Sequence, residues 1–306
     1  MRCIVGSTGF VGSNLVLSGA FDEALHSSNI QEAYGRKPEL LVYAGVRAAK
    51  FLANKDAEAD WQQVHTAIEN IERIAPRRLV LISTVDVYPV PADVDESSEI
   101  DEAQLAPYGR NRYRLEQWVR ENVPGALVVR LPGLFGRNLR KNFLYDLLTV
   151  IPAMLSEGKY AELAARSSLV AESYSRQANG FYACGVTDVA SREGLKQEFM
   201  RLGFTAMNFT DSRGVFQFYD LRHLWGHIEA ALAAGISLLN IATEPVRADE
   251  IYRFLYGKDF VNELDRSVPH YYYRTQHTEV LGGENGYIFS HDEVLADIRR
   301  FVEGWK

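Results

Sequence analysis

The chain has 306 residues, enough for one large domain or two, and its 47% hydrophobic and 24% charged residues are typical of a folded globular protein. Acidic residues outnumber basic ones by 40 to 33, and this net charge of −7 lacks the basic excess of a nucleic-acid-binding protein. Only Cys3 and Cys184 are present, no apolar run approaches the roughly 18 residues that cross a bilayer, and residues 1–12 lack the apolar stretch of a signal peptide. We therefore expect a soluble, cytoplasmic protein that keeps its N-terminus.

Short apolar runs alternate with helical patterns along the chain. Arg2–Val5 is apolar and stops at Gly6, and helical spacing follows over residues 10–20. Further apolar runs span residues 40–44, 79–82, 126–129 and 238–241, and helical patterns span residues 57–74 and 110–121. Buried strands that alternate with helices predict an α/β fold with a parallel sheet.

The alternation ends after Phe135. Residues 150–215 combine polar helical stretches with aromatic turns, and helices are predicted over residues 248–256 and 291–302. These changes predict a nucleotide-binding domain formed by residues 1–136 and 216–246. Residues 137–215 and 247–306 are predicted to form a second region that covers the binding cleft.

A glycine-rich turn follows the first predicted strand and opens the first helix. Gly6, Gly9 and Gly12 have G-x-x-G-x-x-G spacing. Glycine permits a tight turn, and a helix N-terminus offers backbone N–H groups to a pyrophosphate. The predicted cofactor-binding residues here are Gly6, Thr8, Gly9, Phe10, Val11 and Gly12, together with Ala44 and Gly45 after the run that begins at Leu40.

The residues after the second predicted strand, near 23–27, bear on the choice of cofactor. A carboxylate about 20 positions after the glycines would hold the ribose 2′-hydroxyl of NAD. Ser27, Ser28 and Asn29 stand there instead, without a carboxylate. Because a 2′-phosphate can accept hydrogen bonds from these residues, the sequence favours NADP slightly, with no adjacent arginine to strengthen the preference.

Four motifs occur in a recognisable order. They are the glycine turn, residues 82–88 (Ile-Ser-Thr-Val-Asp-Val-Tyr), residues 108–112 (Tyr-Gly-Arg-Asn-Arg) and residues 130–136 (Arg-Leu-Pro-Gly-Leu-Phe-Gly). In these motifs the chain resembles the extended short-chain dehydrogenases/reductases, which include nucleotide-sugar epimerases, dehydratases and reductases. The resemblance implies a doubly wound Rossmann sheet with a smaller, mostly C-terminal substrate domain.

The resemblance also implies the catalytic residues. Tyr108 would be the general acid/base, with Arg112 contributing to catalysis and to cofactor binding, and Thr84 would hydrogen-bond the reacting oxygen. A free tyrosine has a pKa near 10, so a nearby cation must lower it before it serves near neutral pH. The family's Y-x-x-x-K lysine is replaced here by Arg112, which can lower that pKa and bind a ribose but cannot release a proton. Arg112→Lys is therefore expected to retain activity.

Asp86 stands where the family's sugar dehydratases carry a base, whereas Val85 replaces their acid. A full dehydratase set is thus absent. Asp86 could still deprotonate a carbon beside a keto group, as epimerisation requires, and the alternative is a turn or capping carboxylate.

Four further residues are candidate substrate contacts by their position relative to the family's segments: Asn142, Gln217, Tyr219 and Arg274. No metal site is predicted, because His223 and His227 lack the intervening glutamate of a zinc-protease motif.

The sequence therefore predicts an NAD(P)-dependent oxidoreductase or epimerase acting on a nucleotide-linked or activated sugar. The expected partner of the protein is this small-molecule substrate, and no nucleic-acid or membrane partner is expected. The sequence is also compatible with a homodimer. The alternative is a dinucleotide-binding regulatory protein without turnover.

Overall fold

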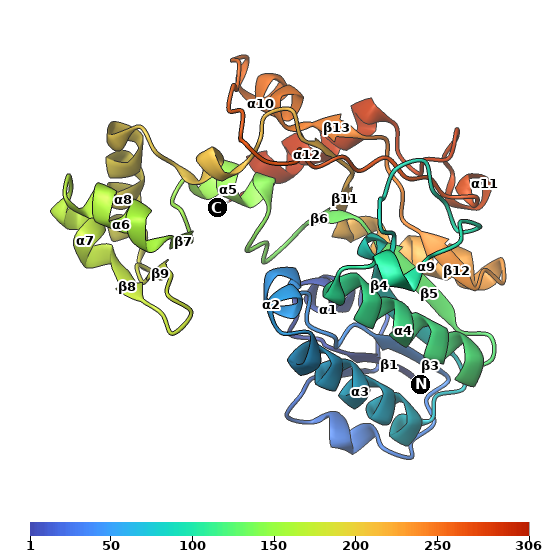
Figure 1. The fold of residues 1–306 in the computed structure, drawn as a ribbon. Coiled ribbons are helices and arrows are strands. Elements are labelled where there is room, and N and C mark those ends of the chain that lie inside the picture. The colour runs from blue at the N-terminus through green and yellow to red at the C-terminus, as the bar shows by residue number, and fades with distance from the viewer. Residues whose placement is uncertain (306) are drawn as a thin grey trace. The chain divides into compact units, whose positions relative to one another are not determined.

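A six-stranded parallel sheet forms the centre of one of two compact units in the computed structural model, which describes residues 1–305 (Figure 1). Its strands are β1 (Arg2–Val5), β2 (Glu23–Leu25), β3 (Leu40–Tyr43), β4 (Leu79–Thr84), β5 (Leu127–Leu131) and β12 (Leu238–Asn240). Their order is β12-β5-β4-β3-β1-β2, and every neighbouring pair is parallel. The predicted α/β fold with a parallel sheet is therefore confirmed.

Helices cover both faces of this sheet. On one face lie α3 (Ala57–Ile74) and α4 (Pro107–Asn122), side by side in Figure 1, and on the other lie α1 (Phe10–Val16) and α9 (Leu224–Ala233). Successive strand residues point to opposite faces, so Cys3 and Val5 pack in the core beneath α3 and α4 whereas Ile4 packs beneath α1 and α9. Both faces are buried, and this explains why the strands are continuous apolar runs. The sheet is doubly wound, as the resemblance implied.

The winding reverses between β1 and β3, because β2 lies on one side of β1 and β3 on the other. Open parallel sheets bind ligands outside the carboxyl ends of their strands at such a reversal. Gly6 follows β1, Ala44 follows β3 and Thr84 ends β4. The sheet therefore brings the glycine turn and the Ser/Thr motif to the same edge.

Most element boundaries agree with the patterns, and α3 spans the predicted residues 57–74. Two helices differ. α1 stops at Val16 instead of continuing to residue 20, because the Ser18 hydroxyl bonds the carbonyl of Leu15 and Gly19 adopts a left-handed conformation. α4 begins at Pro107, three residues before the predicted start, since proline suits the first turn of a helix. Tyr108 consequently lies in the first turn of α4.

The two units are residues 1–138, 215–246 and 270–301, and residues 139–214 and 247–269 with the chain from Val302 on. Residues 270–301 thus belong to the unit that holds the large sheet, whereas the sequence pattern placed them in the second region. The remaining elements of the first unit are α2 (Lys50–Lys55), β6 (Gly133–Phe135), β10 (Val215–Phe216), β11 (Phe218–Asp220) and α11 (Thr278–Leu281). β13 (Val246–Arg247) and α12 (His291–Glu303) begin in this unit and end in the other.

The second unit has its own small core around Leu155, Leu163, Leu195 and Phe199. Its elements are α5 (Phe143–Thr149), β7 (Met154–Leu155), α6 (Glu157–Ala164), α7 (Ser168–Ser173), β8 (Tyr174–Arg176), β9 (Tyr182–Cys184), α8 (Val189–Leu202) and α10 (Ala248–Tyr256). The strands form a sheet in the order β7-β9-β8. Within residues 1–305, no helix has the length and apolar character needed to span a membrane.

Candidate functional site

The glycine turn after β1 leaves one glycine open to the outside. A Cβ at Gly6 would lie 2.4 Å from the carbonyl oxygen of Ala44, and one at Gly12 would lie 2.1 Å from that of Gly6. These two glycines are therefore required by the packing of the protein itself. A Cβ at Gly9 would meet only the Gly6 oxygen, at 3.2 Å, and Gly9 is exposed. The space beside Gly9 can thus take a ligand that approaches the backbone closely.

The residues after β2 and β3 flank this turn. Ser27 and Ser28 are exposed, and the Ser28 hydroxyl lies 2.8 Å from Nδ1 of His26. The side-chain oxygen of Asn29 accepts a bond from the His26 N–H at 2.7 Å, so it already serves to shape the turn. Gly45 packs closely against the ring of Tyr43.

Tyr108 and Thr84 lie together at the end of β4. The helix that carries Tyr108 packs closely on the turn at Val85–Val87, since a Cβ at Gly109 would lie 2.1 Å from the carbonyl oxygen of Asp86. The N–H of Tyr108 donates to the Asn54 side chain at 2.9 Å, and its side chain is buried. The structure therefore brings Tyr108 against the turn that follows Thr84 at the end of β4. These structural roles of Gly109 and Asn54 were not predicted.

Charges of both signs act on the Tyr108 hydroxyl. Burial raises the pKa of Tyr108 above its usual value, and the positive charge of Arg112 opposes this shift without overcoming it. Asp86 raises the pKa further, whereas the bond with Thr84 and the charge of Lys50 lower it. Because its pKa is raised, the Tyr108 side chain is a neutral phenol near pH 7.

Arg112 forms a salt bridge with Asp60, a residue for which no role was predicted. Its guanidinium makes two bonds to Asp60, of 2.7 and 2.9 Å, and a third of 2.6 Å to the carbonyl oxygen of Arg47. Both charged side chains are buried, and the guanidinium lies over the ring of Tyr108 at 4.5 Å from its centroid. Arg112 therefore supports the tyrosine ring, and its charge is largely offset by Asp60.

The bonds of Arg112 predict a loss of stability for Arg112→Lys, while the expected retention of activity stays a prediction. An ammonium cannot reproduce two parallel bonds to a carboxylate together with a third to a carbonyl. Losing one bond to a charged group costs about 2 kcal/mol, so we expect the free energy of unfolding to fall by about that amount in denaturant titrations. Arg114→Lys, on the same helix but paired with Glu102 at the surface, is the control and should change stability little. Equal stability of Arg112→Lys and wild type would contradict this role.

Asp86 is paired with a lysine from another helix. Its Oδ1 lies 2.7 Å from Nζ of Lys50 in α2 and accepts a bond of 3.2 Å from the Tyr271 hydroxyl. Burial alone would lower the pKa of Lys50, but the charge of Asp86 and the bonds to Asp86 and Tyr271 outweigh burial and raise it. Asp86 is thus one member of an ion pair. No local pattern marks Lys50, which lies 36 residues before its partner.

The four predicted substrate residues use their polar atoms within the fold. Gln217 is buried and donates to the carbonyls of Thr243 and Tyr273. Tyr219 is 1% exposed, with its hydroxyl 2.7 Å from Nδ1 of His227.

The other two candidates behave similarly. Arg274 lies over the rings of Tyr272 and Tyr287. Asn142, in the second unit, caps α5 by accepting a bond from the N–H of Tyr145. All four thus have contacts within the fold, and a role for them in substrate binding stays a prediction.

Asp220, His223 and Asp297 bring three potential metal-ligating atoms within 4.8 Å of one another. Arg222 pairs with both carboxylates, and Arg300 pairs with Asp297. Both carboxylates are thus paired with arginines. The cluster is an ion-pair network that joins the turn after β11 to α12.

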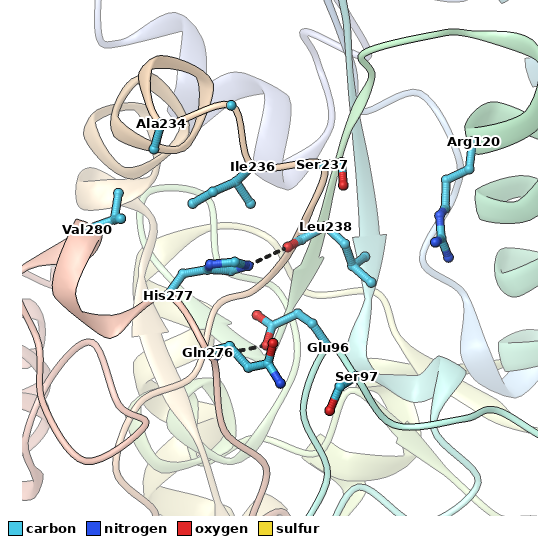
Figure 2. Close-up of a pocket in the computed structure, with 11 residues that line it drawn as sticks. Glu96, Ser97, Arg120, Ala234, Ile236, Ser237, Leu238, Gln276, His277 and Val280 are labelled. Atoms are coloured by element: carbon cyan, nitrogen blue, oxygen red, sulfur yellow. Dashed lines mark hydrogen bonds between the residues drawn. The ribbon is translucent and has the colours of Figure 1, made fainter.

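A cavity of about 520 Å³ lies at the start of β12, away from the residues above. Figure 2 shows His277, Gln276 and Glu96 along its wall. Nε2 of His277 lies 3.1 Å from the carbonyl oxygen of Leu238, and Glu96 accepts bonds from the N–H groups of Gln276 and Asn240. These polar groups are thus hydrogen-bonded to one another along the edge of β12. The cavity includes none of the glycine-turn residues and none of the groups around Tyr108, which remain the better candidate site.

Comparison with known proteins agrees with this fold. No family model matches the chain, and no curated protein matches it in sequence. Many solved structures match the whole fold. The Bordetella bronchiseptica enzyme WbmG in complex with NAD and UDP is 14% identical, covers 99% of this chain and 94% of its own, and superposes with a TM-score of 0.63.

Two further structures are similar to the same degree. The dTDP-4-dehydrorhamnose reductase from Bacillus anthracis in complex with NADP is 14% identical, covers 100% of this chain and 99% of its own, and has a TM-score of 0.62. The UDP-glucose 4-epimerase from Thermotoga maritima with UDP-glucose is 14% identical, with coverages of 99% and 98% and a TM-score of 0.56. The resemblance inferred from the motifs is thus confirmed at the level of the fold.

Proposed function

We propose that this chain is an NAD(P)-dependent oxidoreductase or epimerase of the extended short-chain type, and that it acts on a nucleotide-linked or otherwise activated sugar. The observation that carries the proposal is the close packing of the helix that carries the buried Tyr108 on the turn that follows Thr84 at the carboxyl end of β4. Tyr108 and Thr84 therefore lie at the same sheet edge as the glycine turn after β1. The candidate acid/base Tyr108 and the candidate dinucleotide-binding turn thus lie at the same edge of the parallel sheet.

The glycine turn fits a dinucleotide. The open face of Gly9 allows a pyrophosphate to approach the backbone, and the residues after β2 add exposed hydroxyls without a carboxylate. Solved structures with this fold were determined with NADPH, NADP and NAD. We propose NAD(P) as the cofactor, with the slight preference for NADP that the absence of a carboxylate favours.

A bound nicotinamide would supply the hydride chemistry. The hydroxyls of Thr84 and Tyr108 would bind the oxygen of the reacting carbon, and Tyr108 would give or take the proton on that oxygen. Asp86 is held in an ion pair with Lys50, so it could remove a proton from carbon only after that pair breaks. The arrangement favours hydride transfer with proton movement on oxygen over chemistry that needs a second base.

Gly9→Asp tests the cofactor site. The new carboxylate would occupy and repel the pyrophosphate position, so we expect binding of NADPH and NADH to be lost while the protein stays folded. Gly194→Asp, at an exposed position of α8 where a Cβ would meet nothing within 4 Å, is the control and should bind like wild type. Calorimetric titration with both dinucleotides measures the effect. Unchanged binding by Gly9→Asp would remove the turn from the site, and NADH binding more than about tenfold (1.4 kcal/mol) tighter than NADPH would contradict the preference for NADP.

The second candidate is a dinucleotide-binding regulatory protein. It is favoured by the raised pKa of Tyr108, because the charge of Arg112 does not overcome the effect of burial. A panel of keto- and hydroxy-sugar nucleotides separates the two. Tight dinucleotide binding with no turnover on any member of the panel would support the regulatory protein.

A further inference from the structure

We propose that Asp60, in the first turn of α3, is a positioning residue of the cofactor-binding site, and that it acts through Arg112 on the loop between β3 and α2 (residues 44–49, the β3–α2 loop). The inference rests on the proposed function for its link to a dinucleotide. Its structural content, the anchoring of one loop by a buried ion pair, can be measured without a cofactor.

Three bonds from α4 converge on the carboxylate of Asp60. Arg112 donates to its two oxygens at 2.7 and 2.9 Å, and the side-chain amide of Asn111 donates to Oδ2 at 2.9 Å. The side chains of Asp60 and Arg112 are only 6% and 5% exposed. Parallel bonds between a guanidinium and a carboxylate fix their mutual orientation, so Asp60 determines the direction in which the guanidinium points.

The third bond of Arg112 reaches the β3–α2 loop. The Nη2 group that bonds Asp60 also donates to the carbonyl oxygen of Arg47 at 2.6 Å. Because one nitrogen makes both bonds, the anchoring of Arg47 depends on Asp60 holding the guanidinium in place. A single ammonium cannot make the parallel pair together with the third bond, and this accounts for an arginine where the resembled family carries lysine.

The β3–α2 loop in turn packs on the glycine turn. A Cβ at Gly6 would lie 2.4 Å from the carbonyl oxygen of Ala44 and 2.8 Å from the backbone nitrogen of Gly45. The first residues of the loop therefore border the turn that is proposed to bind the pyrophosphate. Where they lie is set at one end by β3 and at the other by the bond from Arg112 to Arg47.

A direct contact of Arg112 with the cofactor would make the opposite prediction. If the guanidinium bound a ribose or phosphate itself, loss of the Asp60 charge would free it and increase its attraction to an anionic dinucleotide. If the guanidinium anchors the loop, the same loss releases the loop and weakens binding. The sign of the change in affinity in Asp60→Asn thus separates the two roles.

Calorimetric titration of Asp60→Asn with NADPH and NADH is the first test. We expect both dissociation constants to rise at least about tenfold, equal to 1.4 kcal/mol of binding free energy. Glu58→Gln removes the same charge at an exposed position of α3, and Val64→Ala removes buried atoms one turn after Asp60. Both controls should bind like wild type. Equal or tighter binding by Asp60→Asn, or an equal loss in Val64→Ala, overturns the proposal.

A double substitution, Asp60→Leu with Arg112→Met, covers the case in which Asp60→Asn fails to fold. Apolar side chains of similar volume can replace a buried ion pair without loss of stability. This variant should unfold at about the wild-type denaturant concentration and still bind both dinucleotides at least about tenfold more weakly, since the bond to Arg47 is gone. Wild-type affinity in the stable double variant overturns the proposal.

Amide hydrogen exchange without cofactor is the second readout. The backbone N–H groups of the β3–α2 loop should exchange faster in Asp60→Asn than in wild type, because the loop opens more often, and at the wild-type rate in Glu58→Gln. Unchanged exchange in Asp60→Asn overturns the anchoring. If exchange rises as expected but the wild-type protein binds neither dinucleotide, the anchor stands and the proposed function fails.

Discussion

Replacing Tyr108 with phenylalanine is expected to lower turnover by about 10²–10⁴-fold, the contribution that a positioned acid or base typically makes. The substitution removes only the phenolic hydroxyl of this buried residue. The ring stays buried beneath the guanidinium of Arg112, so the fold and the bound cofactor should be preserved. The effect should therefore lie in kcat, with dinucleotide affinity unchanged.

Tyr113→Phe is the matched control for this experiment, because Tyr113 lies on the same helix. Turnover is measured on the nucleotide-sugar substrate that the panel identifies, at several pH values. A Tyr108→Phe variant that keeps wild-type turnover across the pH range would exclude this tyrosine as the acid/base. Loss of cofactor binding together with turnover would point to a structural defect instead, and calorimetry separates these outcomes.

Replacing Glu116 with alanine is expected to lower the free energy of unfolding by about 3–5 kcal/mol, the cost of breaking a buried ion pair. Glu116 and Arg130 are 1% and 2% exposed, and Arg130 donates three bonds to the carboxylate. The Ser83 hydroxyl donates to the same carboxylate at 2.5 Å. Without Glu116 the guanidinium remains buried with a bond of 2.8 Å to the Tyr88 hydroxyl, and a cavity opens beside it.

Denaturant unfolding near pH 7 measures this prediction. Glu102→Ala removes the partly exposed partner of Arg114, which also lies on α4, and should cost less than about 1 kcal/mol. Glu116→Gln keeps the shape of the side chain but not its charge, so its loss of stability should fall between the two. A change below about 1 kcal/mol in Glu116→Ala would show that Arg130 finds another partner or reaches solvent.

Local patterns predicted the central sheet well. β1 and α3 have the predicted boundaries, because apolar runs of four residues and apolar spacing over five turns are strong signals. The motifs also placed Thr84 and Tyr108 in one site, and the Tyr108 helix does pack on the turn that follows Thr84. The glycine turn was predicted as a unit, but only the structure separates Gly9, which is open, from the glycines that the packing requires.

The charged partners could not be predicted in this way. Asp60 meets Arg112 across 52 positions, and Lys50 meets Asp86 across 36. Such pairs depend on how α2, α3 and α4 pack against each other, and no short spacing encodes that packing. The burial of Tyr219 could not be predicted either. A tyrosine near an expected substrate segment gives the same sequence pattern whether it is buried or exposed, and here it is buried.

The side chains that cover β12 limit how this protein can associate. The last strand of a sheet exposes backbone groups that can pair with a strand of another molecule. Here the outward carbonyl of Leu238 accepts from His277, and the outward N–H of Asn240 donates to Glu96. A second chain would have to displace a carboxylate and an imidazole to add its strand at this position. Continuous intermolecular sheets, whether in a dimer or an aggregate, are therefore disfavoured along β12.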